Sequence, residues 1–260
     1  MPNKLNRDSE TYLTRKKHFD SLLTIYGRKP VLEALNNMQV SCQKIHLAKS
    51  NREEGIIREI RSLAERRNIP ISLHDRQSLS RISRNQKQDQ GVAADLFCPA
   101  HQDVEQFLKN RGAKKFTLLA VDGIHNPQNL GMIIRSVAAS PLDGLILASN
   151  NNTAISPLVI KASAGAVFNC PVVRCDSLAA TLETLKERTE ICVLSGASER
   201  ELQTYQPVGS AIYVVGNETE GVSKSVSDLA HVRLRLTMHK GVESLNVAVM
   251  ASLLAFRGSF

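Results

Sequence analysis

The residues best suited to bind a ligand are a glycine-flanked acidic loop at 216–221 and a single arginine, Arg135, on an earlier helix pattern. The loop directly follows a β-branched run at 211–215, so a strand is expected to end where glycines let a ligand approach bare backbone. Around Arg135, apolar residues recur at helical spacing, which turns the guanidinium away from the core. Gly131 lies one turn earlier on roughly the same face and is expected to leave room beside it.

A parallel sheet would bring this loop and this helix together. Strand patterns alternate with helix patterns through the second half of the chain, which is typical of a mostly parallel sheet. The expected strands are 116–121, 145–148, 171–174, 191–194, 211–215 and 232–237, and the expected helices are 130–138, 178–188 and 247–256. Ligands of such sheets lie beyond the carboxyl ends of the strands, where residues 126–129, 195–197 and 216–221 all fall.

The last predicted helix, 247–256, carries no charge. Ser244 is expected to cap its first turn. A helix that is apolar on every side must be buried, and this one is too short to span a bilayer, which takes about 20 apolar residues. We therefore expect it to pack in a core or against a second subunit.

The first half of the sequence predicts a smaller α/β domain. A helical pattern begins after Gly27, strands are expected at 44–48 and 69–73 with a charged helix at 54–67 between them, and a closing strand starts near 90. A basic stretch at 76–87 lies before that strand. The predicted division is a flexible basic arm at 1–20, a first domain at 21–98, a polar linker at 99–115 and a second domain at 116–260.

Charge is distributed unevenly over the 260 residues, whose formal net charge is +8. Residues 1–115 hold 22 Lys and Arg against 13 Asp and Glu, whereas residues 116–260 hold 11 against 12. A basic first half favours a polyanionic partner, most often a nucleic acid. A solvated basic surface without a partner is the alternative.

Cysteine usage and hydropathy exclude several other classes. The five cysteines are scattered and form no C-x-x-C pair, so neither a disulfide framework nor a metal site is expected. No apolar run reaches membrane length, and the polar start of the chain has no secretory core. We expect a cytoplasmic protein with no membrane partner.

Three stretches of the second half resemble a known family. Residues 126–131 (NPQNLG) with Arg135, residues 216–221 (GNETEG) and residues 238–249 (MHKGVESLNVAV) are similar to the three motifs of the SpoU RNA ribose 2′-O-methyltransferases. Residues 27–35 and 89–92 are similar to the substrate-binding domain that precedes many of these enzymes and itself looks like a group of ribosomal RNA-binding proteins. The absence of G-x-G-x-x-G after a strand disfavours nicotinamide binding and the commoner glycine-rich methyltransferase fold.

The resemblance implies a fold and a reaction. The expected fold is α/β, with a C-terminal trefoil-knotted, Rossmann-like (SPOUT) methyltransferase domain preceded by a small α/β, ribosomal-protein-like RNA-binding domain. The knot runs against the general rule that folds are unknotted. The family dimerises through the knot region. The implied reaction is methylation of a ribose 2′-hydroxyl by S-adenosylmethionine in structured RNA, with ribosomal RNA favoured over transfer RNA. A non-catalytic RNA-binding or ribosome-assembly factor with the same fold is the alternative.

The resemblance also assigns roles to residues. Arg135 would clamp an RNA phosphate and orient the hydroxyl, because a guanidinium is effectively never deprotonated and so is a poor base. Asn129 and Asn246 would hydrogen-bond near the ribose and cofactor, although Asn129 could instead be only a helix cap. Glu218 would fix the loop or the RNA backbone. The implied cofactor contacts are Ser195, Gly196, Ala197, Gly216, Leu236, Met238, Ser244 and Leu245, and the RNA-binding candidates are Arg28, Lys29, Arg81, Arg84 and Lys87.

The sequence departs from the family pattern near the third motif. The family usually has Pro at the position of Thr237 and Gly at the position of Lys240, and a trailing Gly of the first motif is replaced near Ser140. These departures concern the shape of the cofactor loop. His125 and His239 lie beside the motifs but do not belong to the family pattern.

Overall fold

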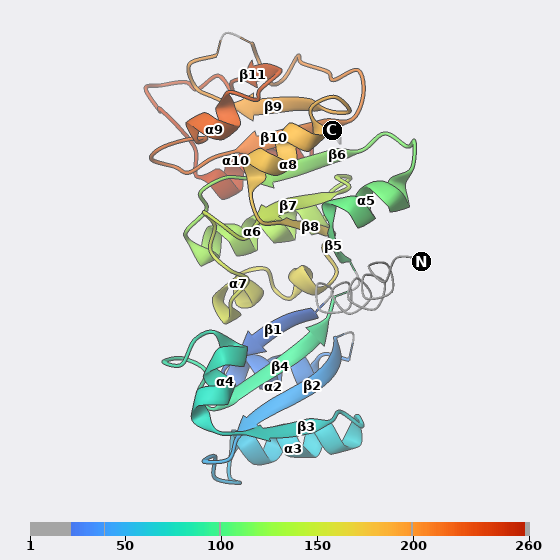
Figure 1. Ribbon diagram of the computed structural model, residues 1–260. Helices are drawn as coiled ribbons and strands as arrows, with labels where there is room; N and C mark the ends of the chain where they lie inside the picture. Colours follow the sequence, from blue (N-terminus) through green and yellow to red (C-terminus); the bar gives the residue numbers. More distant parts are fainter. Residues whose placement is uncertain (1–21, 39, 99, 199, 258–260) are drawn as a thin grey trace, which may run out of the picture. The chain divides into compact units, whose positions relative to one another are not determined.

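The computed structural model describes residues 22–38, 40–98, 100–198 and 200–257, which form two compact units (Figure 1). The N-terminal unit comprises the described residues up to 98 and the short piece 155–157, and the C-terminal unit comprises the remainder. The basic arm expected at 1–20 lies outside the described residues. Within the part of the chain that is described, no helix is both long and apolar enough to cross a membrane.

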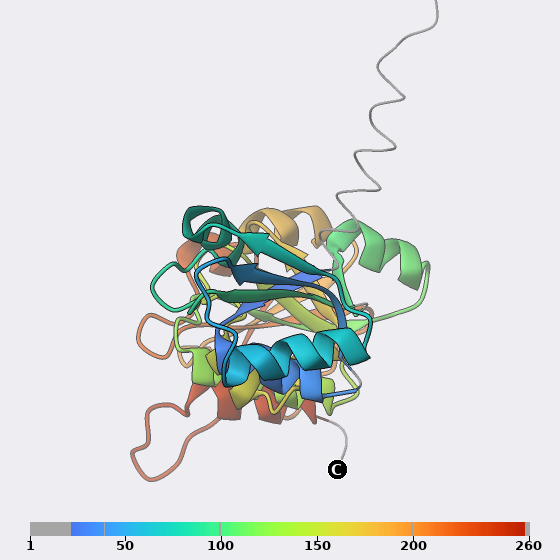
Figure 2. The ribbon, with the colours of Figure 1, turned by 90° about the horizontal axis from the view of Figure 1, so that it is seen from below.

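The N-terminal unit is a four-stranded sheet with helices on both faces. The strand order is β1-β4-β2-β3, in which β4 is antiparallel to β1 and β2, and β3 is parallel to β2. The strands are β1 (Leu22–Tyr26), β2 (Ser41–Ala48), β3 (Ile71–His74) and β4 (Val92–Phe97). Helices α2 (Arg28–Asn36) and α3 (Ile56–Arg66) cover one face, and α4 (Arg76–Ser83) covers part of the other (Figure 2).

The basic stretch expected at 76–87 begins as helix α4. Asp75 caps this helix, because its side chain accepts a hydrogen bond from the backbone N–H of Ser78. Leu79 packs against Ala48 and Ala93 of the sheet, so one apolar residue in a polar stretch anchors the helix. Arg84 ends it in the left-handed region with φ of 53°.

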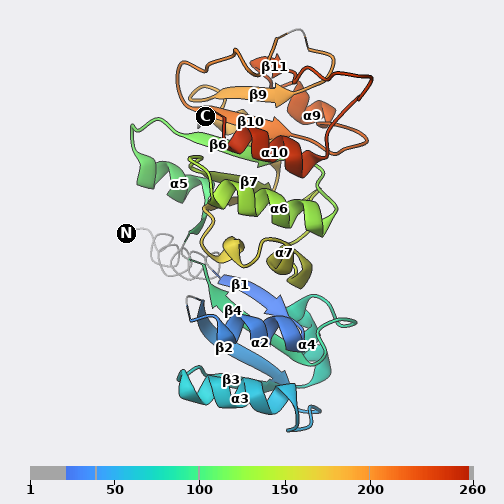
Figure 3. The same cartoon turned by 180° about the vertical axis from the view of Figure 1, so that it is seen from behind.

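The C-terminal unit contains a seven-stranded sheet of order β11-β9-β10-β6-β7-β8-β5, in which each strand runs parallel to its neighbours. Its strands are β5 (His101–Asp103), β6 (Thr117–Val121), β7 (Gly144–Ala148), β8 (Val172–Cys175), β9 (Glu190–Leu194), β10 (Ala211–Val215) and β11 (Val232–Leu234). Helices α6 (Pro127–Ala138) and α10 (Val247–Ala255) cover one face (Figure 3). Helices α5 (Val104–Arg111), α8 (Leu178–Leu185) and α9 (Lys224–Ser227) cover the other, and the short α7 (Pro157–Ala162) packs against α6.

The segment predicted to be a linker, 99–115, instead forms the beginning of the C-terminal unit from Ala100 onwards. Its first residues form edge strand β5, which pairs with β8, and its next residues form α5, capped by Asp103. Phe107 anchors this helix by an edge-to-face contact with Phe116, with ring centroids 5.2 Å apart. Phe107 is the one residue of α5 that is buried. Its neighbours in the helix are mostly polar, so the sequence of this segment resembles that of a linker.

Helix α10 is buried on one side and exposed on the other. Val247, Ala248, Ala251, Leu254 and Ala255 are buried, mainly against α6, whereas Val249 is 48% exposed and Leu253 is 46% exposed. The core of the single chain therefore covers only one side of α10, and burial of the other side against a second subunit stays a prediction. The cap is also different from the expected one, because Asn246 rather than Ser244 accepts a hydrogen bond from the backbone of the first turn.

The order of three neighbouring strands determines where a site can form. Strands β9, β10 and β6 lie side by side and run in the same direction, so the loops that follow them meet at one edge of the sheet. These loops begin at Ser195, Gly216 and Asp122. The loop that enters α10 reaches the same edge, because α10 packs on α6, which follows β6.

Candidate active site

Three polar side chains from distant parts of the sequence meet at this edge. Asn129 Nδ2 donates to Glu218 Oε1 at 2.8 Å, and Asn246 Nδ2 donates to the same oxygen at 2.6 Å. Asn246 Nδ2 also lies 3.2 Å from Asn129 Oδ1, and the backbone N–H of Val247 lies 3.4 Å from Glu218 Oε1. We call Asn129, Glu218 and Asn246 the polar triad. All three were predicted from the sequence as residues of the site.

Local structure at the start of α6 leaves Asn129 free to face Glu218. Asn126 caps the helix, since its side chain accepts from the backbone N–H of Gln128 at 2.8 Å, and Pro127 occupies the first turn, where a missing N–H costs nothing. Asn129 is not the cap and is only 5% exposed. A buried amide needs hydrogen-bond partners, and the triad supplies them.

The loop that carries Glu218 is closed tightly on itself. Asn217 and Gly221 exchange two backbone hydrogen bonds of 2.9 Å, so Gly216 lies against the backbone of Gly221. A Cβ on Gly216 would be 2.1 Å from the carbonyl carbon of Gly221, which excludes every other residue type there. The Asn217 side chain also donates to the carbonyl of Gly123 at 2.9 Å and thereby ties this loop to the loop after β6.

Asp122, which sequence reasoning did not select, ties three loops together. It follows β6 directly and is 4% exposed. Its Oδ2 accepts from the backbone N–H of Ser223 at 2.7 Å, and its Oδ1 accepts from Asn151 Nδ2 at 3.2 Å. The loops after β6, β7 and β10 are therefore joined at one carboxylate. The sequence feature that could have identified Asp122 is its position immediately after a strand of five apolar or β-branched residues.

The Arg135 side chain is exposed and has no hydrogen-bond or ionic partner among the described residues. It is therefore separate from the polar triad in this structure. Gly131 does not provide space beside Arg135, contrary to our expectation. A Cβ on Gly131 would be 2.4 Å from the Cβ of Ala162 and 2.8 Å from the carbonyl of Val159, so this glycine allows α6 to pack closely on α7.

The residues expected to contact a cofactor come from loops at the same edge. Gly196 and Ala197 are exposed after β9, and a Cβ on Gly196 would meet nothing within 4 Å, so its backbone is open. Ser195 is half-buried, with its N–H bonded to the carbonyl of Leu234 at 2.8 Å. The remaining candidates are half-buried (Gly216, Leu236, Met238 and Leu245) or exposed (Ser244).

Comparisons with known proteins identify the family of this chain. The model of the SpoU rRNA methylase family matches residues 116–256, and that of the RNA 2′-O ribose methyltransferase substrate-binding domain matches residues 24–101. The chain belongs to the SpoU methylase family. A Staphylococcus saprophyticus protein named for the TrmH family of tRNA/rRNA methyltransferases is 33% identical over 242 residues, which is 90% of this chain and 94% of that protein. A protein of the same name from Staphylococcus haemolyticus is 30% identical, with the same coverage of both chains.

Solved structures show the same fold. The SpoU methyltransferase AviRb from Streptomyces viridochromogenes, in complex with AdoMet, aligns with a TM-score of 0.62 at 19% identity over 97% of this chain and 92% of that chain. An AdoMet-bound rRNA methyltransferase from Sinorhizobium meliloti aligns with a TM-score of 0.60 at 20% identity over 99% and 95%. Membership of the SpoU family makes this chain an RNA methyltransferase, and S-adenosylmethionine is the methyl donor of the family.

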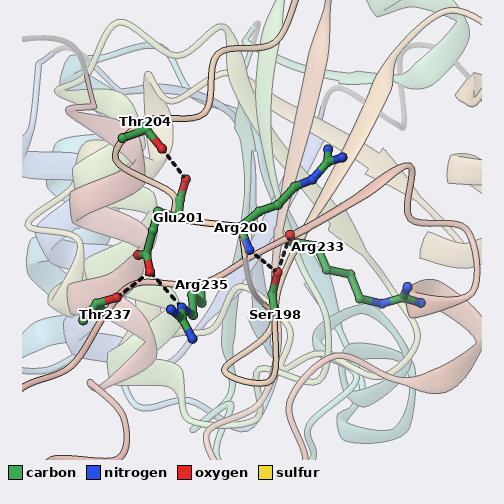
Figure 4. A network of polar contacts seen from close by, with 7 residues as sticks. All are labelled: Ser198, Arg200, Glu201, Thr204, Arg233, Arg235 and Thr237. Carbon is green, nitrogen blue, oxygen red and sulfur yellow. Dashed lines mark hydrogen bonds and ion pairs between the residues drawn. The ribbon is translucent and has the colours of Figure 1, made fainter.

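Thr237, which stands where the SpoU pattern usually has Pro, takes part in a polar network (Figure 4). Its hydroxyl donates to Glu201 Oε1 at 2.7 Å, and Arg235 Nε donates to the same oxygen at 2.8 Å. These two bonds, the Thr237 bond first, hold the pKa of Glu201 below its ordinary value. Ser198 donates to the carbonyl of Arg233 at 2.6 Å in the same network. The loop after β9 is thus fastened to the chain that leads to Leu236 and Met238.

Lys240 occupies a backbone conformation that suits glycine. Its φ is 57°, and that of Gly241 is 76°. Few residues other than Gly, Asn and Asp adopt this region readily. The Gly that SpoU proteins usually have at the position of Lys240 would adopt this positive φ without strain. The lysine adopts the same conformation, so the replacement of Gly by Lys leaves the shape of the turn unchanged.

The residues expected to bind RNA lie around the α4 side of the N-terminal unit. Arg28 is used internally, because its Nε donates to the carbonyl of Gln90 at 3.2 Å and its Nη2 donates to Asn51 Oδ1 at 3.3 Å. It holds the 86–91 loop against the start of α2. Lys29 and the three other candidates (Arg81, Arg84 and Lys87) are exposed.

Proposed function

We propose that this chain transfers a methyl group from S-adenosylmethionine to a ribose 2′-hydroxyl of structured RNA. Ribosomal RNA is the favoured substrate over transfer RNA. The observation that carries the proposal is the polar triad, which stands beside loops of open backbone at the carboxyl edge of the sheet. Ligands of parallel sheets bind at this edge. The basic first half of the chain supplies the charge that an RNA partner needs.

The loops of the C-terminal unit fit the cofactor. The open backbone at Gly196 and the close approach of Gly216 to Gly221 make a wall of amides and carbonyls, without side chains that would fill the space. We place the cofactor on Ser195, Gly196, Ala197 and Gly216, on Leu236 and Met238, and on Ser244 and Leu245. When bound, the cofactor supplies an electrophilic methyl group on a sulfonium.

The triad residues hold and orient polar groups in this proposal. Glu218 Oε1 receives three N–H donors, and Oε2 has no partner among the described residues, so it is available to accept a hydrogen bond from a ligand. Glu218 also fixes the amides of Asn129 and Asn246. Pre-oriented polar groups cost no reorganisation when the substrate arrives, which is how positioning accelerates a transfer.

Arg135 acts as a phosphate clamp in this proposal. A guanidinium is a poor general base, so the hydroxyl proton passes to a phosphate oxygen or to water instead. A guanidinium fork binds two phosphate oxygens at once and thereby fixes the neighbouring ribose. Its exposure, without a partner among the described residues, leaves it available to RNA.

The exposed side of α10 supports a homodimer. Val249 and Leu253 of α10 and Met132 of α6 are each more than 40% exposed, although the two helices pack together and their Ser136 and Ser252 hydroxyls lie 2.8 Å apart. A second copy of the chain would bury this apolar surface. The dimer and the trefoil knot are part of the proposal and follow from the family, as does a cytoplasmic location.

Transfer of labelled methyl from S-adenosylmethionine to total RNA that lacks the modification tests the proposal. The labelled RNA is fractionated by size and the labelled nucleotide is mapped. Label on one ribose of ribosomal RNA supports the enzyme and the favoured substrate, whereas label in transfer RNA keeps the reaction and overturns the substrate. Label on a base rather than a ribose overturns the 2′-O assignment. No label, together with no cofactor binding, favours the RNA-binding or ribosome-assembly alternative.

A further inference from the structure

A small pocket lies in the N-terminal unit, between the start of α4 and the 86–91 loop. Its volume is about 160 Å³. Pockets for drug-sized ligands are larger, roughly 300–1,000 Å³, so this one suits a single planar group. Its described lining residues are Arg76, Leu79, Gln86, Lys87, Asp89, Gln90 and Gly91.

The wall of the pocket formed by the 86–91 loop is held in place from several directions. Gln90 and Gly91 both have positive φ, of 51° and 76°. Asp89, which is 7% exposed, accepts from Ser83 Oγ and from the backbone N–H of Gly91, both at 2.9 Å. The Asn51 side chain donates to the carbonyl of Gly91 at 2.7 Å. A wall fixed in this way needs little reordering to receive a ligand, which favours binding.

The rim of the pocket is cationic and its floor is apolar. Arg76 and Lys87 are exposed, and neither side chain has a hydrogen-bond or ionic partner among the described residues. The carboxylate that lines the pocket, Asp89, is occupied by Ser83 and Gly91. Leu79, 1% exposed, lies below. An apolar floor beneath two free cations matches a flat base with a phosphate attached.

We propose that this pocket takes one unstacked nucleotide of the RNA, with its base over Leu79 and its phosphate on Arg76 and Lys87. The proposal rests on the proposed function, in that the N-terminal unit binds RNA. Proteins that read RNA by sequence take up bases from loops and bulges, because bases inside an A-form helix are out of reach. The substrate is therefore RNA that offers an unpaired, unstacked nucleotide.

The test compares two RNA probes with the full-length protein at one salt concentration. One probe is a hairpin with a short loop of random sequence, and the other is a fully paired duplex of the same stem. We expect wild type to prefer the hairpin. Arg76→Ala with Lys87→Ala is expected to lower hairpin affinity about tenfold more than duplex affinity, because a paired duplex has no unstacked nucleotide whose phosphate these two cations could hold in the pocket.

The matched control removes two exposed cations from the opposite face of the same sheet, Arg58→Ala with Arg66→Ala on α3. It is expected to lower both affinities by one small factor. If the pocket variant behaves as the control does, or lowers both affinities equally, the nucleotide pocket is wrong. A second measurement needs no variant: 2-aminopurine placed in the hairpin loop should change its fluorescence on saturation with wild type, and no change overturns the proposal.

The outcome is separable from that of the proposed function. Hairpin preference that depends on Arg76 and Lys87, in a chain that transfers no methyl group, supports the pocket and overturns the enzyme. Methyl transfer to RNA by a wild type without hairpin preference supports the enzyme and overturns the pocket.

Discussion

Asn246 Nδ2 donates to Glu218 Oε1 across 2.6 Å, and this contact joins the start of α10 to the loop after β10. Asn246 also caps α10, since its Oδ1 accepts from the backbone N–H of Ala248 at 2.9 Å. One side chain thus both begins the helix and fixes the carboxylate. The shape of the site and the stability of the helix are consequently coupled.

Replacement of Glu218 is expected to damage both stability and activity. Glu218→Ala removes the acceptor of the buried Asn129 amide, which costs about 1–3 kcal/mol for an unsatisfied polar group. Thermal unfolding and methyl transfer measure the two effects. Glu220→Ala removes the same charge from the same loop, where its exposed side chain has no described partner, and should change neither. Equal behaviour of the two variants would show that the triad has no role.

Gly216→Ala is expected to abolish cofactor binding while the rest of the sheet stays folded. The added methyl group would lie 2.1 Å from the carbonyl carbon of Gly221, so the loop must open. Titration calorimetry with S-adenosylmethionine measures the loss. Gly209→Ala is the control, because a Cβ there meets nothing within 4 Å. Normal cofactor affinity in Gly216→Ala would mean that this loop is not part of the cofactor site.

Arg135→Ala is expected to lower the rate of methyl transfer about 10²–10³-fold, the size of effect seen when one positioned electrostatic contact is lost. Affinity for cofactor should change little, because Arg135 contacts no described residue of the cofactor loops. Affinity for RNA should also change little, because one phosphate contact is lost while the basic first half of the chain keeps all of its charges. Lys109→Ala, an exposed cation on α5, is the charge-matched control. Single-turnover kinetics separates the transfer step from binding. A variant that transfers at the wild-type rate would rule out the phosphate clamp.

The three residues of the polar triad were predicted because they lie in the three stretches that resemble the SpoU motifs. Asn129, Glu218 and Asn246 are 28 to 117 positions apart, and they meet because β10 pairs in parallel with β6 and α10 packs on α6. The alternation of apolar strands and helices was enough to predict that sheet. The motif resemblance was needed for the rest, because one asparagine on a helix carries no functional signal by itself.

Other features could not be predicted from local patterns. The linker reading of 99–115 was wrong because β5 is only three residues long and pairs with β8, some 70 positions away. We expected Gly131 to leave room beside Arg135, because a glycine in a helix predicts a close neighbour but does not identify that neighbour. In the structure α7 does so. Asp122 was missed because its partners, Ser223 and Asn151, are identified only once the three loops are in place.

Asp122→Asn is expected to raise the KM for S-adenosylmethionine more than it lowers kcat. The two carboxylate oxygens of Asp122 accept N–H donors from Ser223 and Asn151. The side-chain amide of an asparagine has only one oxygen, so its NH2 group would face one of these donors and that donor would lose its acceptor. A buried donor left without an acceptor costs about 1–3 kcal/mol, which loosens the loops after β7 and β10. Asp122→Glu should restore part of the cofactor affinity if the charge is what matters. A fall in kcat alone would place Asp122 in the chemistry and contradict a positioning role.

A hydrogen-bonded row crosses all four strands of the N-terminal sheet. Thr24 Oγ1 donates to Asp95 Oδ1 at 2.7 Å, Asp95 Oδ2 lies 2.9 Å from His46 Nε2, and His46 Nδ1 lies 3.0 Å from His74 Nε2. Burial and the neighbouring His46 lower the pKa of His74. Burial alone would raise the pKa of Asp95, but its bonds from His46 and Thr24 outweigh burial and lower it.

The row makes stability depend on pH. A group whose pKa is lower in the folded state stabilises the fold above its unfolded pKa, and this contribution is lost as pH falls through the folded value. For His74 the loss therefore begins below about pH 6.5, the ordinary histidine value, and for Asp95 it begins only below about pH 4. We expect the unfolding temperature of the full-length protein to fall between pH 7 and 5, and His74→Gln, whose amide can still donate to His46, to flatten that segment. An unchanged slope in His74→Gln would assign the dependence to another group.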